Sequence, residues 1–346
     1  MAKGKAKPKA AKVPLKSYTI KDGAENTRKT VVATKAIKQG SVLLTEAPIM
    51  YVKTISDENI LTVFNGLDQK EKEQVLSMVP AKSNRKDDED QTKVLDMFQR
   101  KNINHKAEGQ ALYYVLSRIR HSCAPNIALI PLLESSYGSI EVRACRAIKK
   151  GEDLCADYLP AINTFEPKAV RSAIFGDKFV CDCEVCIRED KALEDNERIR
   201  ASIKEHYRNT TICVTLGNFV GGFDACRSML QSMMEIEEEC VLKIISVTLE
   251  CWQLAVLAQL QDPALEGFEI SKWKSDSLRL CKILGKCEVD KWKATEQWIA
   301  NQSFNEFDTI KLRAKGPWAF QYIQKLVEEN RNTVGSLSEA VEKTVA

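Results

Sequence analysis

Residues 120–126, Arg120-His121-Ser122-Cys123-Ala124-Pro125-Asn126, decide how this chain is interpreted, because a cysteine cluster about sixty residues later complements them. That cluster is Cys181-Asp182-Cys183-Glu184-Val185-Cys186, which brings three thiols within six residues. Three thiolates at this spacing can surround one zinc ion at Zn–S distances of about 2.3 Å, and a structural zinc site takes four protein ligands. The sequence therefore predicts a metal site that needs a fourth ligand from elsewhere in the chain.

Several side chains can supply that fourth ligand. The candidates are Cys123, Cys145, Cys155, the later cysteines and a few histidines. The alternative to a metal site is that the three clustered cysteines are unrelated small buried residues. The chain has 12 cysteines and shows no secretory signal, so we expect a reducing intracellular compartment, the nucleus or the cytoplasm. In such a compartment, clustered cysteines favour a metal over disulfides.

Length and composition indicate an ordinary globular protein. A chain of 346 residues with 44% hydrophobic and 29% charged residues is long enough for two domains. The net charge of +3 conceals six lysines and no acid within residues 1–16, so the remainder carries 3 − 6 = −3. We expect residues 1–16 to form a disordered basic tail. The tail is either an arm that contacts nucleic acid or directs the chain to the nucleus, or a solubilising segment.

One long apolar stretch covers residues 240–260. It is interrupted by Lys243, Glu250 and Gln253, which a membrane-spanning helix would have to bury in lipid. The stretch therefore predicts a buried helix, and no contact with a membrane is expected.

The hydrophobic patterns change along the chain. They predict strands at 30–34, 41–45, 127–133 and 139–146, helices at 57–80 and 109–119, and a polar connector at 83–91. From about Ala192 onward the pattern is helical, most clearly at 237–260, 271–284 and 318–329. A strand-rich first half followed by helices predicts an α+β domain with an α-helical C-terminal region.

Three segments in order, RHSCAPN (120–126), GEDLCADY (151–158) and FVCDCEVC (179–186), resemble the SET family of protein-lysine methyltransferases. The resemblance covers about residues 26–190 and is closest to the SET-and-MYND-like proteins common in fungi. It implies an α+β, SET-type β-fold at 17–190, with a helical insertion at about 55–105 and a post-SET zinc cluster at about 177–190. An α-helical domain would follow at 191–346. Residues 50–110 contain no cysteine and only His105, so the MYND zinc finger of the better-known relatives is missing.

The resemblance also implies roles for individual residues. Cys123 would join Cys181, Cys183 and Cys186 around one structural zinc ion. Tyr158 matches the catalytic tyrosine, and Phe179 matches an aromatic residue that closes the lysine channel or covers the adenine of the methyl donor. The implied donor is S-adenosylmethionine, and the implied partner is a protein substrate with a lysine-bearing tail. The acceptor amine must first lose a proton, and an apolar channel beside a sulfonium lowers its pKa from about 10.4.

The residues that the resemblance places at the cofactor depart from the family pattern. Lys29 stands where relatives carry a Gly-x-Gly turn, which lets the backbone approach the cofactor closely. Arg120 replaces an asparagine, and it would either pair with the carboxylate of the cofactor or block the pocket. His121 would position the adenine region and the turn; the alternatives are a zinc ligand or a satisfied core histidine. Asn126 is expected to fix the turn through hydrogen bonds to the backbone, and Asp177 stands where relatives often carry a tyrosine.

Two functions from different classes follow. The first is an S-adenosylmethionine-dependent protein-lysine N-methyltransferase acting on a histone or another basic protein. The second is a catalytically degenerate SET-fold protein that serves as a peptide-binding or scaffold module. Tyr158 and the intact cysteine cluster favour the enzyme. Arg120, Asp177 and the lost glycines favour the module.

Overall fold

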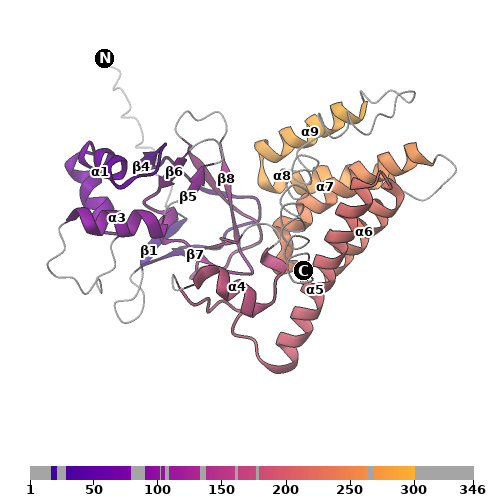
Figure 1. The fold of residues 1–346 in the computed structure, drawn as a ribbon, viewed down its shortest axis with the longest axis horizontal. Helices are drawn as coiled ribbons and strands as arrows, with labels where there is room; N and C mark the ends of the chain where they lie inside the picture. The colour runs from indigo at the N-terminus through magenta and orange to yellow at the C-terminus, as the bar shows by residue number, and fades with distance from the viewer. Residues whose placement is uncertain are drawn as a thin grey trace, which may run out of the picture.

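The computed structural model describes residues 17–21, 29–78, 90–101, 103–105, 109–132, 138–159, 163–176, 179–262 and 269–300. The basic tail at 1–16, Asp177, and the helix expected at 318–329 lie outside these residues. Figure 1 shows the strands with the shorter helices on one side of the molecule and the long C-terminal helices on the other. An α+β half therefore precedes a helical region, as the sequence predicted.

The elements of the first half are β1 (Tyr18–Lys21), β2 (Thr30–Ala33), β3 (Val42–Glu46), β4 (Met50–Val52), α1 (Asp57–Asn65), α2 (Gln69–Leu76), α3 (Asp90–Lys101), β5 (Ile103–His105), β6 (Gly109–Leu112), the 3₁₀-helix η2 (Leu116–Arg118), β7 (Arg120–His121), β8 (Ile127–Pro131), β9 (Ile140–Ala144), β10 (Cys155–Ala156), the 3₁₀-helix η3 (Asn163–Phe165) and α4 (Lys168–Phe175). The elements of the second half are α5 (Asp190–Thr215), α6 (Phe219–Met234), α7 (Glu237–Gln261), α8 (Ile270–Leu284) and α9 (Lys286–Ala300).

Small antiparallel sheets make up the first half. Strand β9 pairs with both β3 and β8, and β6 pairs with both β4 and β5. In β9 the side chains alternate as expected, with Ile140, Val142 and Ala144 buried. These residues pack into one core with Val31 of β2 and Ile127 of β8. The strands expected at 30–34, 41–45, 127–133 and 139–146 are thereby confirmed to within a few residues.

The helix expected at 109–119 is wrong. Residues 109–112 form β6, the central strand of its sheet, and only η2 follows. Gly109 has φ +141°, and a Cβ there would lie 2.5 Å from the carbonyl oxygen of Val52 on β4. The strand can therefore approach β4 only because residue 109 lacks a side chain. Pairing with strands distant in sequence has overridden the helical spacing of the apolar residues.

The helix expected at 57–80 is divided in two. Helix α1 begins at its N-cap Ser56 and ends before Gly66. Asp68 then caps α2, because its side chain accepts a hydrogen bond from the backbone N–H of Glu71 and the Glu71 carboxylate accepts one from the backbone N–H of Asp68. With α3, these helices bury Phe64 and Phe98 against the sheet that contains β6. The three helices thus lie between β4 and β5 in the chain and pack on one sheet.

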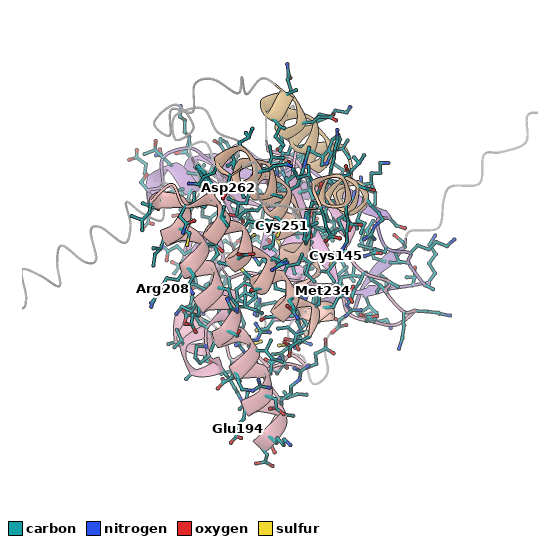
Figure 2. All side chains as sticks on the ribbon, turned by 90° about the vertical axis from the view of Figure 1, so that its right-hand side faces the viewer. Cys145, Glu194, Arg208, Met234, Cys251 and Asp262 are labelled. Atoms are coloured by element: carbon teal, nitrogen blue, oxygen red, sulfur yellow. The ribbon has the colours of Figure 1, made fainter. Side chains whose placement is uncertain are left out.

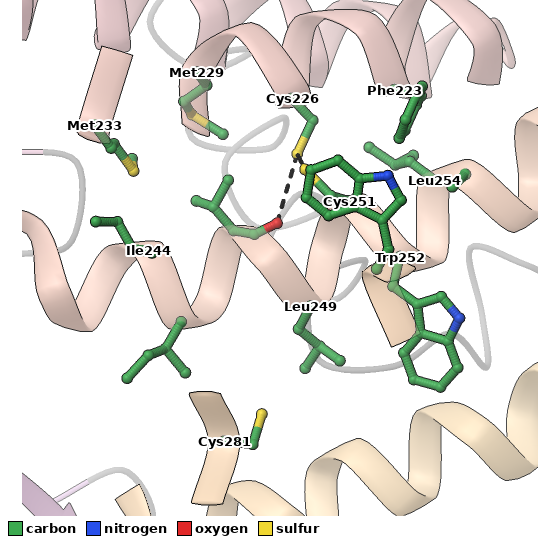
Figure 3. Close-up of a cluster of buried hydrophobic side chains, with 14 of the residues drawn as sticks. Phe223, Cys226, Met229, Met233, Ile244, Leu249, Cys251, Trp252, Leu254 and Cys281 are labelled. Atoms are coloured by element: carbon green, nitrogen blue, oxygen red, sulfur yellow. Dashed lines mark hydrogen bonds between the residues drawn. The ribbon is translucent and has the colours of Figure 1, made fainter. Parts of the chain in front are cut away.

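The long helices enclose the second core. Figure 2 looks onto this region, with Met234 at the end of α6 and Asp262 directly after α7. At the contact between the two helices, Cys226 and Met229 of α6 pack against Cys251 and Trp252 of α7 (Figure 3). The Trp252 ring stacks on Trp292 of α9 with 5.3 Å between ring centroids. Cys226, Cys240, Cys251 and Cys281 are thus core residues.

Helix α7 contains the long apolar stretch of the sequence. An 18-residue window within residues 239–261 has a mean hydropathy of 1.7, and the helix is long enough to cross a membrane, but 67% of that window is buried inside the structure. The helix lies between α6 and α8, which cover its apolar side chains. Its apolar composition is accounted for by this packing.

Ion pairs join the two halves close to residue 164. Arg200 of α5 is buried, donates to the carbonyl oxygen of Thr164 and pairs with Glu239 of α7. Lys204 of α5 lies 2.6 Å from the carboxylate of Glu166. A buried guanidinium needs such partners because its desolvation costs several kcal/mol. The helices are therefore anchored to the segment that follows Tyr158.

Candidate functional site

The segment 120–126 is held in place by hydrogen bonds to the segment 152–156. Strand β7 pairs in parallel with β10, and the amide of Ser122 donates to the carbonyl of Ala156 at 3.0 Å. Asn126 binds the second segment through its side chain. Its Nδ2 donates to Glu152 Oε1 (2.9 Å) and to the Asp153 carbonyl (2.8 Å), while its Oδ1 accepts from the amide of Cys155 (2.8 Å). Asn126 fixes the turn by bonding to the backbone, as the sequence predicted.

This turn brings Cys123 to the late cysteines. The sulfur atoms of Cys123, Cys181, Cys183 and Cys186 all lie within 4.8 Å of one another. Cys123 Sγ is 3.6 Å from Cys186 Sγ, and the Cys123 amide donates to Cys183 Sγ at 3.4 Å. A turn at 183–187, closed by hydrogen bonds from the amides of Cys186 and Ile187 to the Cys183 carbonyl, points the thiols inward.

The donor set fits a tetrahedral zinc ion. Four sulfurs at about 2.3 Å from one ion would lie about 3.8 Å apart, which agrees with the observed spacing. The hydrogen bonds among the four thiols lower the pKa of Cys183 and Cys186 and raise the pKa of Cys123 and Cys181, so without an ion the four sulfurs share their protons unevenly. Cys145 and Cys155, the other nearby candidates, are not part of this group of four.

His121 lies between the cysteines and Tyr158. Its side chain is fully buried. Nδ1 accepts a hydrogen bond from the Tyr158 amide at 3.0 Å, and Nε2 lies 3.4 Å from Cys123 Sγ. Burial lowers the pKa of His121, so the neutral ring is favoured, with Nδ1 as acceptor and the proton on Nε2. His121 is thus a buried histidine whose two ring nitrogens both face the protein.

Tyr158 belongs to a cluster of aromatic rings. Its ring is 5.6 Å from that of His121 and 6.4 Å from that of Phe179, and its hydroxyl donates to the carbonyl oxygen of Ile119. Phe175 of α4 completes the cluster at 4.7 Å from His121 and 4.4 Å from Phe179. Tyr158 is 45% exposed, so the cluster is open to solvent on its side. Such a site has apolar walls and a hydroxyl at its edge.

Arg120 connects the cysteine loop to the turn before β10. Its Nη1 lies 3.3 Å from Asp153 and its Nη2 lies 2.5 Å from Asp182, which stands between two of the clustered cysteines. Both ends of the guanidinium fork are therefore engaged by carboxylates. Lys29 directly precedes β2, whose residues Val31 and Val32 pair with the segment 153–154. Lys29 and Arg120 are thus both close in the fold to the segment 153–154.

Several residues of the site were not predicted from the sequence. Phe175 could have been noticed, because it precedes Phe179 by four residues. Asp153 and Asp182 could have been noticed as acids inside two of the segments that carry the family resemblance. Asp157 accepts from Thr164 Oγ1 at 2.7 Å and lies 3.8 Å from Lys243 of α7, contacts that only the tertiary structure brings together. No pattern in the sequence pointed to Arg171, a buried residue of α4.

Comparison with known proteins identifies part of the chain. Residues 28–159 match the family described as the SET domain. Histone-lysine N-methyltransferase SET5 of Meyerozyma guilliermondii is 31% identical over 97 residues, which cover 28% of this chain and 19% of that protein. Protein-lysine N-trimethyltransferase SMYD5 of Homo sapiens is 33% identical over 84 residues, which cover 24% of this chain and 20% of that protein. The chain thus spans about a fifth of the length of these curated relatives.

A solved structure of the SET domain of LSMT bound to lysine and AdoHcy aligns over 87% of this chain and 91% of that chain, with a TM-score of 0.33 and 10% identity. The resemblance of the motifs at 120–126 and 151–158 to the SET family agrees with the family match, because both motifs lie inside the matched residues. The chain therefore contains a SET domain, and its relatives over that region are lysine methyltransferases.

Proposed function

We propose that this chain is an S-adenosylmethionine-dependent protein-lysine N-methyltransferase. The observation that carries the proposal is the position of Tyr158, which stands inside the matched SET domain and edges a cluster of aromatic rings. The names of the two curated relatives support the same reaction class. A histone or another basic protein is the proposed substrate, and an intracellular location, nuclear or cytoplasmic, is proposed with it.

Methyl transfer to lysine requires the protein to position the acceptor amine and to exclude water. The rings of Phe175 and Phe179 offer an apolar wall, which disfavours a charged ammonium and so lowers the pKa of a bound lysine. The Tyr158 hydroxyl donates its hydrogen to Ile119 and keeps oxygen lone pairs that can accept a hydrogen bond from the amine. S-adenosylmethionine, when bound, supplies the methyl group. The contribution of the protein is then orientation for an in-line displacement.

We propose one structural zinc ion on Cys123, Cys181, Cys183 and Cys186. Four protein ligands leave no open coordination position, so the ion would hold the loop in place and take no part in the reaction. His121 and Arg120 would link this loop to the rest of the domain through the contacts given above. Nucleic-acid contact through residues 1–16 remains a proposal that rests on their six lysines alone.

A second candidate function is a SET-fold binding module without activity. The contacts of Arg120 favour it, because a cofactor carboxylate would have to compete with Asp153 and Asp182 for the guanidinium. These aspartates are more than one-third exposed, so each pair contributes about 1 kcal/mol or less and can be exchanged. The contacts therefore weaken the cofactor site without closing it.

Methyl transfer to a lysine-bearing peptide array, measured with labelled S-adenosylmethionine, tests the proposal. We expect incorporation by the full chain and a loss of about 100-fold or more in Tyr158→Phe, the range typical of a removed catalytic group. Tyr113→Phe is the matched control, because Tyr113 also donates its hydroxyl to a backbone carbonyl, that of Gly138, but lies in the core. Calorimetry with millimolar S-adenosylmethionine separates the two functions. Peptide binding without cofactor binding would favour the module over the enzyme.

A further inference from the structure

Helix α4 buries an arginine beside the cysteine site. Arg171 is 1% exposed, whereas Val170 and Ile174 on the same helix are 43% and 40% exposed. The helix therefore turns a cation inward and two apolar side chains outward, the reverse of the usual arrangement. Phe175, one turn after Arg171, is also buried and contacts His121. The inward face of α4 thus covers both the cysteines and the aromatic cluster.

The guanidinium of Arg171 faces sulfur. Its Nη1 donates to the carbonyl of Glu166 at 2.5 Å, and its Nη2 donates to Cys186 Sγ at 3.6 Å. Its Nε is buried and has no hydrogen-bond partner. Among the residues that the structure describes, Arg171 makes no salt bridge to a carboxylate. The anion that balances this buried charge must therefore be sought among the cysteines.

The other buried arginines have different partners. Arg200 pairs with the carboxylate of Glu239. Arg118 lies 4.0 Å from the centre of the Tyr114 ring and donates to the hydroxyl of Ser77 at 3.1 Å. A buried charge without compensation is strongly destabilising, by several kcal/mol. Four neutral thiols would leave Arg171 uncompensated, whereas four thiolates around a divalent ion carry a net charge of about −2.

We infer that Arg171 is the buried counter-ion of the four-cysteine metal centre and positions Cys186 for metal binding. This inference rests on the zinc site proposed above. The guanidinium lies against Cys186 and stabilises the negatively charged centre from inside the protein, where solvent cannot screen it. Together with the Cys123 amide on Cys183 and His121 on Cys123, it supplies hydrogen bonds to three of the four sulfurs. Such partners outside the ligand set hold ligands in position and tune metal affinity.

Zinc release from the full chain tests the inference. Zinc-loaded wild type, Arg171→Met and Arg171→Lys are mixed with an excess of a chromogenic chelator, and the release rate and the zinc content per chain are measured. We expect one zinc per wild-type chain and release about 10–100-fold faster from Arg171→Met, the range seen when partners of metal ligands are lost. Arg171→Lys should fall between them, because lysine keeps the charge and loses the planar fork.

Arg118→Met is the matched control, since it also removes a buried arginine but one that contacts no cysteine. It should release zinc at the wild-type rate even if its thermal stability falls. If both Met variants accelerate release equally, or if Arg171→Met releases at the wild-type rate, the assignment of Arg171 is overturned. If the wild type binds no zinc, the metal site itself fails. Should Arg171→Met not fold, Arg171→Gln removes the same charge while keeping a donor for the Glu166 carbonyl, and the same comparison applies.

Discussion

Removal of the metal should release the cysteine loop, residues 181–187, from the rest of the domain. Without an ion, few of the contacts that the structure describes hold this loop besides the weak hydrogen bonds to sulfur from the Cys123 amide and Arg171. Val185 is fully buried, which is worth about 1.5–3 kcal/mol. The loop also makes two internal backbone hydrogen bonds, at about 1 kcal/mol each, and one exposed ion pair between Asp182 and Arg120, at about 1 kcal/mol or less.

The opposing cost is larger. Fixing the backbone of seven residues costs about 1–2 kcal/mol each, so about 7–14 kcal/mol for the loop. The packing, hydrogen bonds and ion pair supply at most about 6 kcal/mol and therefore fall short by at least about 1 kcal/mol. Zinc binding to cysteine sites contributes about 10–16 kcal/mol, which is enough to reverse this balance. The loop should be ordered with the metal and mostly open without it.

Hydrogen-exchange mass spectrometry measures this directly. Peptides covering 179–188 should lose protection by about 5-fold or more when the zinc-loaded chain is stripped with a chelator, since about 1.4 kcal/mol corresponds to a factor of ten. Cys183→Ser should reproduce the stripped state. Peptides from β8 and β9 serve as the internal control and should keep their protection. Equal protection of 179–188 with and without metal would refute the reasoning, because the loop would then be held by packing alone.

Three further substitutions probe the fold. Gly109→Ala should lower the free energy of unfolding by at least about 2 kcal/mol in urea titration, because its φ is +141° and the new Cβ would meet Val52; an unchanged midpoint would contradict the register of β6. Trp252→Ala should cost about 3–5 kcal/mol through the cavity it leaves beside Trp292, and a cost below about 1 kcal/mol would contradict the packing of α7. Burial raises the pKa of Glu250 to about 7, so this acid destabilises the fold increasingly as pH rises from about 4.5 to 7. Glu250→Gln should therefore match the wild type in thermal melts below pH 4.5 and exceed it by up to about 3 kcal/mol above pH 7, whereas a pH-independent difference would exclude this titration.

Local patterns predicted those parts of the site that are encoded within a few residues. The spacing of Cys181, Cys183 and Cys186 marked one end of the group of four, because thiols so close in sequence must also be close in space. The side chain of Asn126 was assigned to the turn correctly, since asparagine bonds readily to nearby backbone. Strand β9 followed from simple alternation of apolar and polar residues. In each case the short-range pattern and the tertiary structure agree.

Other parts depend on contacts that no local pattern encodes. Residues 109–112 carry helical spacing, yet they form the middle strand between β4 and β5 because the partners on both sides satisfy its backbone. In α4 the apolar side chains of Val170 and Ile174 are 43% and 40% exposed, and the structure instead buries the adjacent face with Arg171. The sulfur cluster that Arg171 meets is assembled from residues up to 63 positions apart. The buried charge of Arg171 is compensated only once this cluster has assembled.

His121 makes the cysteine site and Tyr158 a single structural unit. Its Nδ1 accepts from the Tyr158 amide, so the proton of the neutral ring is on Nε2, which faces the sulfur of Cys123. A shift of Cys123 would therefore move the ring, and the ring would move the backbone from which the Tyr158 hydroxyl projects. Because four thiolates leave a zinc ion no free coordination position, a bound ion would act on the proposed methyl transfer through such packing contacts, of which His121 and the Arg171–Phe175 face of α4 are two. The effect of metal loss on the proposed activity should then be conformational, with His121 among the residues that transmit it.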